Sequence, residues 1–519
     1  MAGTAAGLAG AGVAAGSDIS IRAFLPDGSP APDYLLKTLL FTASDGRPFA
    51  LLPRIDGKGT AAIGVPAQKF EIMMVLPVRD FGEVYLYADD AGALYNGGGR
   101  ELLLNYEFAA SRAAFVRRYV QNAGKENIAF SREVTERLER GEAAVRQDSA
   151  AKETAERVRL ANDSLADTMW AGEKAAVERA RQRIGRQGPR PGFLFGCNAF
   201  KFARSPEYAR LFAGLLNYAT VPFYRASTER TEGQPNYSQV DGILSKLPGT
   251  NILPKGHPLV WFHSAGIPDF LRDRPWPAVR ESARQYAFRS VLAYRDRIHA
   301  WDIINEAHDW ANELGFNHEQ LLDLTRMASE TVRAADPTAF RVVNSCCTWG
   351  EYAATGENYK GKMPQPVRTP LEYLHVLEDA RVDYEAIGLQ LYDPVRDMLE
   401  IERQLQRYFV FGKPVHITEL GVPSSDQPDK APQTNDPAAT DPAKKRHVWH
   451  APGWNETTQA DWAEQFYTLC YSMPQVQAIT WWDFSDPAFI PWGGFVDKDN
   501  RPKESYNRLS KLLTSWRSA

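Results

Sequence analysis

Two glutamates in the sequence follow apolar runs in a way that predicts acid–base chemistry. Glu306 closes the run WDIIN, and Glu419 closes the run VHIT. A carboxylate at the end of a buried segment is costly unless it has a purpose. Two such groups facing each other across a cleft can cleave a glycosidic bond. One protonated carboxyl gives its proton to the leaving oxygen, and one ionised carboxylate attacks the anomeric carbon.

The elements that must position these glutamates are short apolar segments alternating with helix-forming stretches. The segments cover residues 193–200, 218–224, 252–262, 298–306, 340–345, 384–392, 414–420 and 478–484. Eight strands alternating with helices predict a (β/α)8 TIM barrel of class α/β over residues 191–519. A doubly wound open sheet is the competing interpretation, but no Gly-rich phosphate loop follows the first strand. In a barrel, Glu306 and Glu419 end the fourth and seventh strands, where functional residues lie.

Strand alternation separates the side chains around Glu419. Val415, Ile417 and Glu419 should share one face, and His416 and Thr418 the other. If Glu419 points to the barrel axis, the alternation predicts that His416 points toward the helices and is structural.

The sequence before residue 191 predicts other kinds of structure. Residues 17–106 read as short strands separated by Asp-Gly turns and predict a β-sandwich-like accessory domain. Residues 107–190 are charged, contain one proline, and predict one or two long amphipathic helices as a connector. Residues 1–16 are an Ala/Gly-rich leader that could be the remnant of a secretory signal, which suggests a secreted or periplasmic protein.

Composition narrows the function classes. The net charge of −4, from 60 basic and 64 acidic side chains, gives no electrostatic reason to expect nucleic acid as a partner. No apolar run approaches the ~20 residues that span a membrane. The four cysteines include an adjacent pair and lack metal spacing, so we expect no zinc site or disulfide framework. We expect no cofactor, and the sequence leaves the oligomeric state open.

Four segments carry a resemblance to a known family. They are WDIINEA, HITELGV, GHPLVWF, and WWDFSD with FVDKDNRPKESYNRL. In this order they resemble the acid/base, nucleophile, third-strand and closing motifs of glycoside hydrolase family 10, the retaining β-xylanases. The resemblance covers residues 193–515, and this chain resembles a divergent member of the family.

The resemblance implies roles for individual residues. Glu306 would be the general acid/base and Glu419 the nucleophile, about 5–5.5 Å apart. Asn305 would bind the 2-hydroxyl of the cleaved sugar. The side chains that would shape the same subsite, its floor and its rim are His257, Trp261, Trp482 and Trp492.

Two departures from the family pattern affect these expectations. On the sixth strand the family usually has Gln-Ser-His, whereas this chain has Gln390, Leu391 and Tyr392. Gln390 and Tyr392 share a face, so a phenol could replace the imidazole beside the nucleophile. On the second strand the family's Glu-Asn-x-Met-Lys-Trp is replaced by PFYR, in which Arg225 could meet a carboxylate or a sugar face.

The leading hypothesis is a retaining endo-β-glycosidase that hydrolyses a β-1,4-linked plant polysaccharide, most simply xylan. The same mechanism on another β-linked glycan, or a non-catalytic carbohydrate-binding barrel, are the alternatives. A carboxyl separation near 6.5–9.5 Å would instead favour inversion. The Pro/Asp-rich stretch 421–455 could be a lid, a substrate wall or a mobile insertion. Its candidate sugar contacts are His447, Trp449 and His450.

Overall fold

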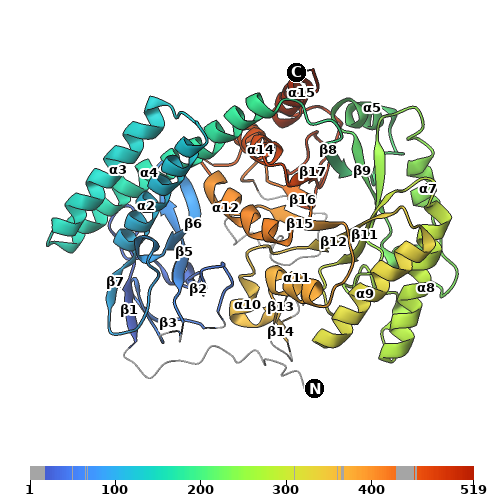
Figure 1. The fold of residues 1–519 in the computed structure, drawn as a ribbon, viewed down its shortest axis with the longest axis horizontal. Helices are drawn as coiled ribbons and strands as arrows, with labels where there is room; N and C mark the ends of the chain where they lie inside the picture. The colour runs from blue at the N-terminus through green and yellow to red at the C-terminus, as the bar shows by residue number, and fades with distance from the viewer. Residues whose placement is uncertain are drawn as a thin grey trace.

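Three parts follow one another along the chain: a β-rich region, a group of long helices and a closed barrel (Figure 1). The computed structural model describes residues 18–49, 51–64, 66, 68–308, 310–358, 361–363, 367–427, 449–450 and 453–518 of the 519-residue chain. The predicted leader and His447 lie outside the described residues. No helix within these ranges combines the length and the apolar character needed to cross a membrane.

The N-terminal region contains two small sheets around one core. One sheet has the order β3-β4-β1-β7 and the other β2-β5-β6. The elements are β1 (Ile19–Arg22), α1 (Asp33–Leu36), β2 (Leu40–Thr42), β3 (Arg54–Gly57), β4 (Thr60–Ile63), β5 (Glu71–Val78), β6 (Gly82–Ala88), η1 (Asp90–Gly92) and β7 (Glu101–Leu103). Side chains of both sheets share one hydrophobic cluster, as in a β-sandwich.

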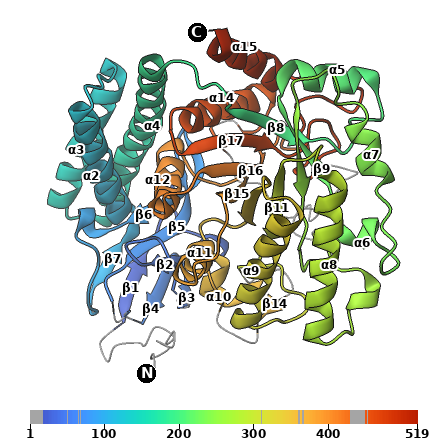
Figure 2. The same ribbon diagram turned by 45° about the vertical axis from the view of Figure 1, so that its right-hand side comes forward.

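The second sheet is buried on both faces. Met73 of β5 and Leu40 of β2 pack against Ala354 of the barrel, while the opposite face of β5 contributes Ile72 and Met74 to the N-terminal core. This sheet therefore lies against the barrel (Figure 2).

The connector consists of three helices, not the one or two that the sequence predicts. They are α2 (Leu104–Lys125), α3 (Arg132–Ala150) and α4 (Thr154–Gln187). The additional break precedes Ser131, whose hydroxyl caps α3 by accepting from the amide of Val134. Helix α4 joins the two cores, because Met169 packs in the N-terminal cluster and Val177 in the barrel cluster.

The barrel has eight parallel strands in the closed order β10-β11-β12-β15-β16-β17-β8-β9. They are β8 (Leu194–Asn198), β9 (Tyr218–Pro222), β10 (Leu253–His257), β11 (Ala300–Asn305), β12 (Phe340–Ser345), β15 (Ala386–Tyr392), β16 (Val415–Gly421) and β17 (Val476–Trp481). Each lies within a segment predicted from the sequence or overlaps it, so the TIM-barrel prediction is confirmed.

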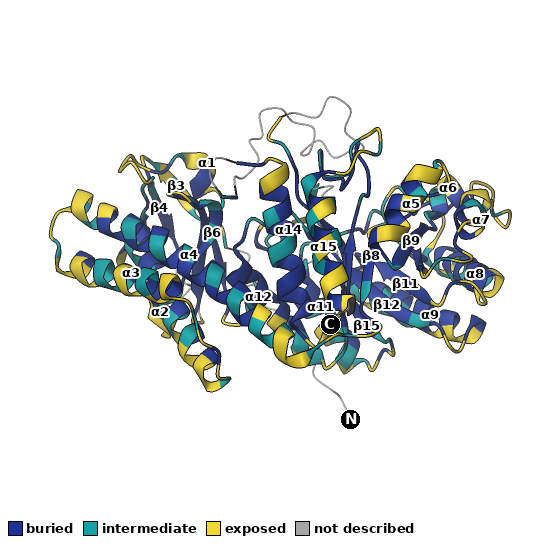
Figure 3. Ribbon diagram, turned by 90° about the horizontal axis from the view of Figure 1, so that it is seen from above, coloured by how far each residue is buried: buried dark blue, intermediate teal, exposed yellow. Residues whose placement is uncertain are grey.

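Helices and short elements cover the barrel. They are α5 (Pro206–Leu215), α6 (Arg225–Thr228), α7 (Ser238–Leu244), η2 (Asp269–Leu271), α8 (Trp276–Tyr294), α9 (His318–Ala335), α10 (Tyr352–Thr355), β13 (Glu357–Asn358), β14 (Gly361–Lys362), α11 (Pro370–Asp379), α12 (Met398–Tyr408), η3 (Phe409–Phe411), α14 (Glu456–Tyr471) and α15 (Glu504–Ser518). The strands are buried, and the outward faces of α5, α7 and α8 are exposed (Figure 3).

Candidate active site

The two predicted glutamates lie at the carboxyl ends of their strands. Glu306 directly follows β11, and Glu419 lies near the end of β16; both are buried. The backbone of Glu306 is left-handed, with φ of 55°, and its amide donates to the carbonyl of Asn344 on β12 at 2.9 Å. A non-glycine residue in this region is strained, and such strain concentrates at functional sites.

The regular alternation predicted for β16 is wrong. The pairing of β16 with both neighbouring strands shifts register around Thr418 and Glu419. This irregularity allows the side chains of Thr418 and Glu419 both to contact Asn344. The Thr418 hydroxyl donates to the Oδ1 of Asn344, and the Nδ2 of Asn344 donates to Glu419 at 3.0 Å. His416 does not point to the helices either, since it stacks on Phe340, which packs with the small cluster at the opposite end of the strands.

Asn344 requires space inside the barrel, and a glycine on the next strand provides it. A Cβ at Gly388 would lie 2.7 Å from the Asn344 Oδ1 and 2.9 Å from the Thr418 Cγ2. Both distances are shorter than a real Cβ contact, so a larger residue at 388 would displace Asn344 and, with it, a donor to Glu419.

Glu306 receives two hydrogen bonds from neutral N–H donors. The indole Nε1 of Trp261 donates to its Oε2 at 2.9 Å, and the amide of Gln390 donates to its Oε1 at 2.9 Å. Asn305 lies next to this pair: its Oδ1 accepts from Asn344 at 2.7 Å and from Gln390 at 3.4 Å. The amides of Asn344 and Gln390 thus link the two carboxylates through Asn305.

Glu419 is held from the other side by a phenol. The hydroxyl of Tyr392 donates to its Oε2 at 2.6 Å, at the position where the sequence predicted a replacement for an imidazole. The Nε2 of His257 lies 3.8 Å from its Oε1. On the far side of the ring, the Nδ1 of His257 bonds Asp302 at 2.7 Å, and Lys255 pairs with the same Asp302 oxygen at 2.7 Å.

Burial sets the proton affinity of the two glutamates. It raises the pKa of Glu306, against the opposing effect of the hydrogen bonds from Gln390 and Trp261. Burial and then the charge of Glu306 raise the pKa of Glu419 to about 8, while the Tyr392 hydrogen bond and Lys255 oppose that shift. Burial therefore disfavours the ionised form of both carboxyls, and the charge of one disfavours ionisation of the other.

Aromatic rings surround the carboxylates. Trp261 stacks on His263 with ring centres 4.4 Å apart, and Trp482 meets His257 edge-on at 5.3 Å. Tyr224 contacts both Trp261 and His257 at 5.7 Å. The face of a sugar ring packs favourably on such surfaces. Trp492, predicted at the rim, is half-buried and donates from Nε1 to the carbonyl of Gln427 at 2.8 Å.

Arg225 lies among protein groups. It is buried, pairs with Glu229 at 2.7 Å, donates to Ser282 at 2.7 Å and stacks over Phe270 and Tyr286. These protein groups enclose the guanidinium, which therefore packs between α6 and α8. Of the two partners predicted for Arg225, the structure shows a carboxylate, that of Glu229, and the prediction of a sugar contact is wrong.

Trp449 and His450 also differ from the prediction. Their rings stack on each other, and His450 packs against Trp170 of α4 and Phe81 of the N-terminal region. Burial lowers the pKa of His450 to about 3. These two side chains therefore attach the end of the 421–455 stretch to the N-terminal half of the chain and are not placed to meet a sugar.

Sequence reasoning missed three polar side chains at strand ends. Asn344 is the penultimate residue of β12, Tyr224 follows β9, and Asp483 follows β17. Asp483 is half-buried and accepts hydrogen bonds from Asn198 at 3.1 Å and from the amide of Phe489 at 2.6 Å. The rule that identified Glu306 and Glu419, a polar residue at the carboxyl end of a barrel strand, would have found all three.

A metal site has no support in the described part of the chain, where no group of three His, Cys, Asp or Glu side chains is arranged to hold an ion.

Comparison with known proteins identifies the family. The profile of "Glycosyl hydrolase family 10" matches residues 224–511, which is more than half of the chain. The chain belongs to this family. The match begins at Tyr224 and includes both glutamates, Trp261, Tyr392 and Trp482, so the family assignment and the carboxyl cluster concern the same barrel.

Curated relatives from this family are distant in sequence. The chain is 23% identical over 345 residues to "Endo-1,4-beta-xylanase 5-like" of Arabidopsis thaliana, covering 64% of this chain and 53% of that protein. It is 26% identical over 307 residues to "Endo-1,4-beta-xylanase B" of Paenibacillus barcinonensis, covering 54% of this chain and 82% of that protein. The chain thus spans about half the length of the Arabidopsis relative.

Among solved structures, the chain is similar to native xylanase 10B from Thermotoga maritima, with 17% identity and a TM-score of 0.47. That likeness covers 66% of this chain and 99% of the Thermotoga chain.

Proposed function

We propose that this protein is a retaining endo-β-1,4-glycosidase that hydrolyses xylan or a closely related plant polysaccharide. The observation that carries the proposal is the buried pair Glu306 and Glu419 at the barrel mouth, each held by two neutral donors. Membership of glycosyl hydrolase family 10 and the xylanase relatives support the substrate class.

The carboxyl pair can supply both groups that a double displacement needs. Because each carboxyl resists ionisation beside the other, the pair can hold one proton and so offer one acid and one carboxylate, which the first step requires. We assign the proton to Glu306, which gives it to the leaving glycosidic oxygen while a Glu419 oxygen bonds to the anomeric carbon. Glu306, now ionised, then takes a proton from water, whose oxygen attacks the anomeric carbon and releases Glu419.

The neighbouring side chains have distinct roles in this proposal. Tyr392 and Asn344 orient Glu419 by donating to different oxygens of its carboxylate. Asn305 binds the 2-hydroxyl of the cleaved sugar, and Trp482 with His257 packs against its face. The exclusion of water from this buried site strengthens each of these hydrogen bonds.

One observation favours a different β-linked glycan as the second candidate. Beside the cleaved sugar, Tyr224 stands at the end of the second strand, where the family motif has other residues. An aromatic ring would bind the next sugar differently from the amide and ammonium groups of that motif. A non-catalytic barrel is disfavoured, because two buried carboxyls are costly to keep without a use.

The test is hydrolysis of a panel of neutral xylan, glucuronoxylan, mannan, mixed-linkage β-glucan and aryl β-glycosides. We expect cleavage of xylan within the chain, with the β-anomer formed first, as seen by NMR during hydrolysis. Glu306→Ala and Glu419→Ala should each lose several orders of magnitude in kcat on xylan. Cleavage of another glycan alone would favour the second candidate, and binding without hydrolysis would overturn the enzymatic proposal.

Azide rescue separates the two roles. With an aryl β-xyloside that needs little acid assistance, azide should restore turnover of Glu306→Ala and give the β-glycosyl azide, because the nucleophile is intact. With Glu419→Ala, azide replaces the missing nucleophile and gives the α-glycosyl azide. The reverse pattern would exchange the roles, and an initial α-anomer from the unaltered protein would establish inversion.

A further inference from the structure

A short, strained loop follows the strand that carries Tyr392. Only residues 393–396 separate the end of β15 from Asp397, the N-cap of α12. Asp393 and Val395 have φ of 35° and 52°, in the left-handed region that non-glycine residues avoid. Such conformations persist where the surrounding structure holds them. The amide of Asp393 also donates to the carbonyl of Gly421 at 2.9 Å, so this loop begins at the ends of β15 and β16.

The N-terminal region holds the middle of this loop through strand β6. The amide of Tyr85 donates to the carbonyl of Val395 at 3.1 Å. The Nε of Arg396 donates to the Tyr87 hydroxyl at 3.2 Å, and its guanidinium lies over the Tyr85 ring at 3.9 Å. The strained loop and the strand that supports it are thus far apart in sequence, since Tyr87 and Arg396 are separated by 309 positions.

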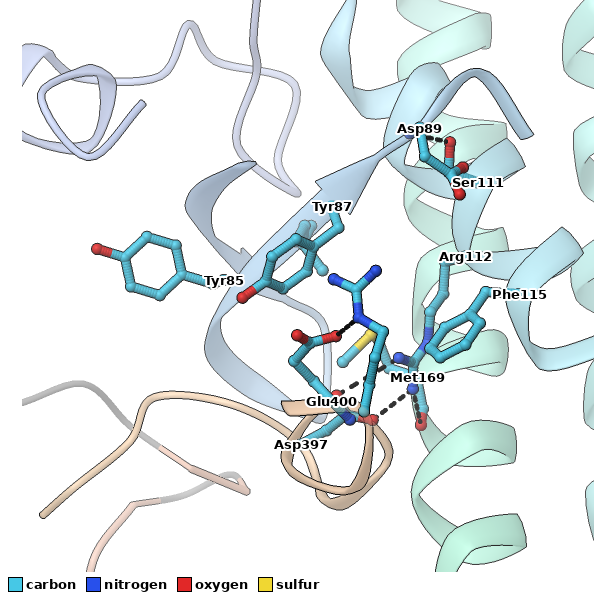
Figure 4. A pocket seen from close by; sticks show the side chains of 11 residues that line it. Tyr85, Tyr87, Asp89, Ser111, Arg112, Phe115, Met169, Asp397 and Glu400 are labelled. Carbon is cyan, nitrogen blue, oxygen red and sulfur yellow. Dashed lines mark hydrogen bonds and ion pairs between the residues drawn. The ribbon is translucent and has the colours of Figure 1, made fainter. Parts of the chain in front are cut away.

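The end of the loop is held by a buried ion pair with the connector. Arg112 of α2 reaches Asp397 with Nη2 to Oδ2 at 2.5 Å and Nη1 to Oδ1 at 3.4 Å, and Figure 4 shows Arg112 next to Phe115. Both side chains of the pair are buried, at 9% and 2% exposure. A bidentate pair of this kind fixes direction as well as distance.

We propose that Arg112 and Asp397 are positioning residues for the reaction: through loop 393–396 they keep the Tyr392 hydroxyl on Glu419. The connector, together with β6 of the N-terminal region, is accordingly a working part of the catalytic barrel, in contrast to a separable accessory domain. This inference rests on the proposed hydrolysis. Loss of the pair frees the loop to relax its left-handed residues, which moves the end of β15 and lengthens the hydrogen bond to the carboxylate.

The test compares two ion pairs of similar burial that join the connector to α12. Arg112→Leu with Asp397→Asn removes both charges, so that no buried charge is left alone, and keeps an oxygen to cap α12. The matched control is Arg179→Leu with Glu402→Gln, which breaks the pair between α4 and α12 at 9% and 2% exposure. Glu402 lies on α12 beyond the loop. Thermal melting and circular dichroism establish that both variants are folded.

We expect the Arg112/Asp397 variant to lose about tenfold in kcat on xylan with KM little changed, within the range of coupling energies between distant sites. The control pair should keep kcat despite a similar loss in Tm. In a Tyr392→Phe background, the Arg112/Asp397 changes should cost almost nothing further, because they act through the same hydroxyl. The inference would be overturned if the Arg112/Asp397 changes lowered kcat equally in the wild-type and Tyr392→Phe backgrounds. It would also be overturned if the two ion-pair variants lost kcat equally.

A milder variant covers the case in which the double variant does not fold. Tyr87→Phe removes only the hydroxyl that accepts from Arg396, and we expect about a threefold loss in kcat that again disappears in the Tyr392→Phe background. An unchanged kcat would contradict the inference. A wild-type protein that hydrolyses none of the glycans would contradict the proposed function instead, so the two failures are distinguishable.

Discussion

The hydroxyl of Tyr392 donates to Glu419 Oε2 at 2.6 Å, and it does so from the neighbouring strand of the barrel. A phenol at this place remains neutral over the working pH range, because burial and the charge of Glu419 raise the pKa of Tyr392 far above its ordinary value. An imidazole could ionise there. Tyr392 therefore acts on Glu419 as a fixed dipole whose effect does not change with pH.

Tyr392→Phe should move the acidic limb of the pH profile. The hydrogen bond lowers the pKa of Glu419, so its loss raises that pKa. If Glu419 is the ionised nucleophile, kcat/KM needs it deprotonated, and the acidic limb should shift upward by about one pH unit. The alkaline limb, which reports loss of the proton from the acid Glu306, should stay in place.

The control for Tyr392→Phe is Tyr237→Phe, which removes a phenol bonded to Ser290 and leaves the carboxyl pair untouched. Its profile should match that of the unaltered protein. A shift of the alkaline limb alone in Tyr392→Phe would show that Glu419 carries the shared proton in the active form.

Trp261→Phe should have the complementary effect. Its indole N–H stabilises the ionised form of Glu306 and lowers the pKa of that carboxyl. Removing it makes the acid harder to deprotonate, so the alkaline limb of kcat/KM should move to higher pH while the acidic limb stays. The pH profile on an oligosaccharide substrate measures this. Movement of the acidic limb instead would contradict the assignment of Glu306 as the acid.

The sequence allowed the barrel and the carboxyl pair to be predicted because both depend on local patterns. Apolar runs of strand length alternate with helical stretches, and Glu306 and Glu419 follow such runs directly. The contacts of Arg225 could not be predicted, since its partners Glu229 and Ser282 are set by how α6 packs on α8. Burial against other elements cannot be read from residue type.

The error over His416 has a specific cause. Alternation holds only in a regular strand, and one irregularity at Thr418 and Glu419 changes which face the preceding residues present. The same limitation applies to the N-terminal region. Its turns predicted a β-sandwich, but nothing local indicates that Tyr85 and Tyr87 face residues 395 and 396 of the barrel.

Asp483→Asn should change which substituted glycans are accepted. The Asp483 carboxylate adds negative charge near the site, and together with Glu419 and Glu306 it adds to burial in raising the pKa of Tyr224. A uronic acid on the bound sugar chain would meet this charge and be disfavoured. The variant should therefore narrow the preference for neutral over uronic-acid-substituted xylo-oligosaccharides about tenfold, mainly through KM.

The measurement compares kcat/KM for the two oligosaccharides of equal length. Asp499→Asn removes an exposed carboxylate paired with Lys498 and should leave the preference unchanged. If Asp483→Asn lowers kcat/KM equally for both substrates, the carboxylate binds sugar hydroxyls without selecting against acidic groups.

His416 should make the protein less stable in mild acid. Burial, followed by the charge of Lys255, lowers the pKa of His416 to about 3, so the folded protein keeps this imidazole neutral. The unfolded chain binds a proton there below its ordinary value of 6.5. As pH falls from 6.5 toward 3, the unfolded state therefore gains protons that the folded state lacks, and the free energy of unfolding decreases by up to about 1.4 kcal/mol per pH unit from this residue.

His416→Phe, which can keep the stack on Phe340, should flatten the dependence of Tm on pH in that window. His375→Phe on the exposed face of α11 should leave the slope unchanged, and equal slopes for His416→Phe and the unaltered protein would show that His416 does not cause the acid sensitivity.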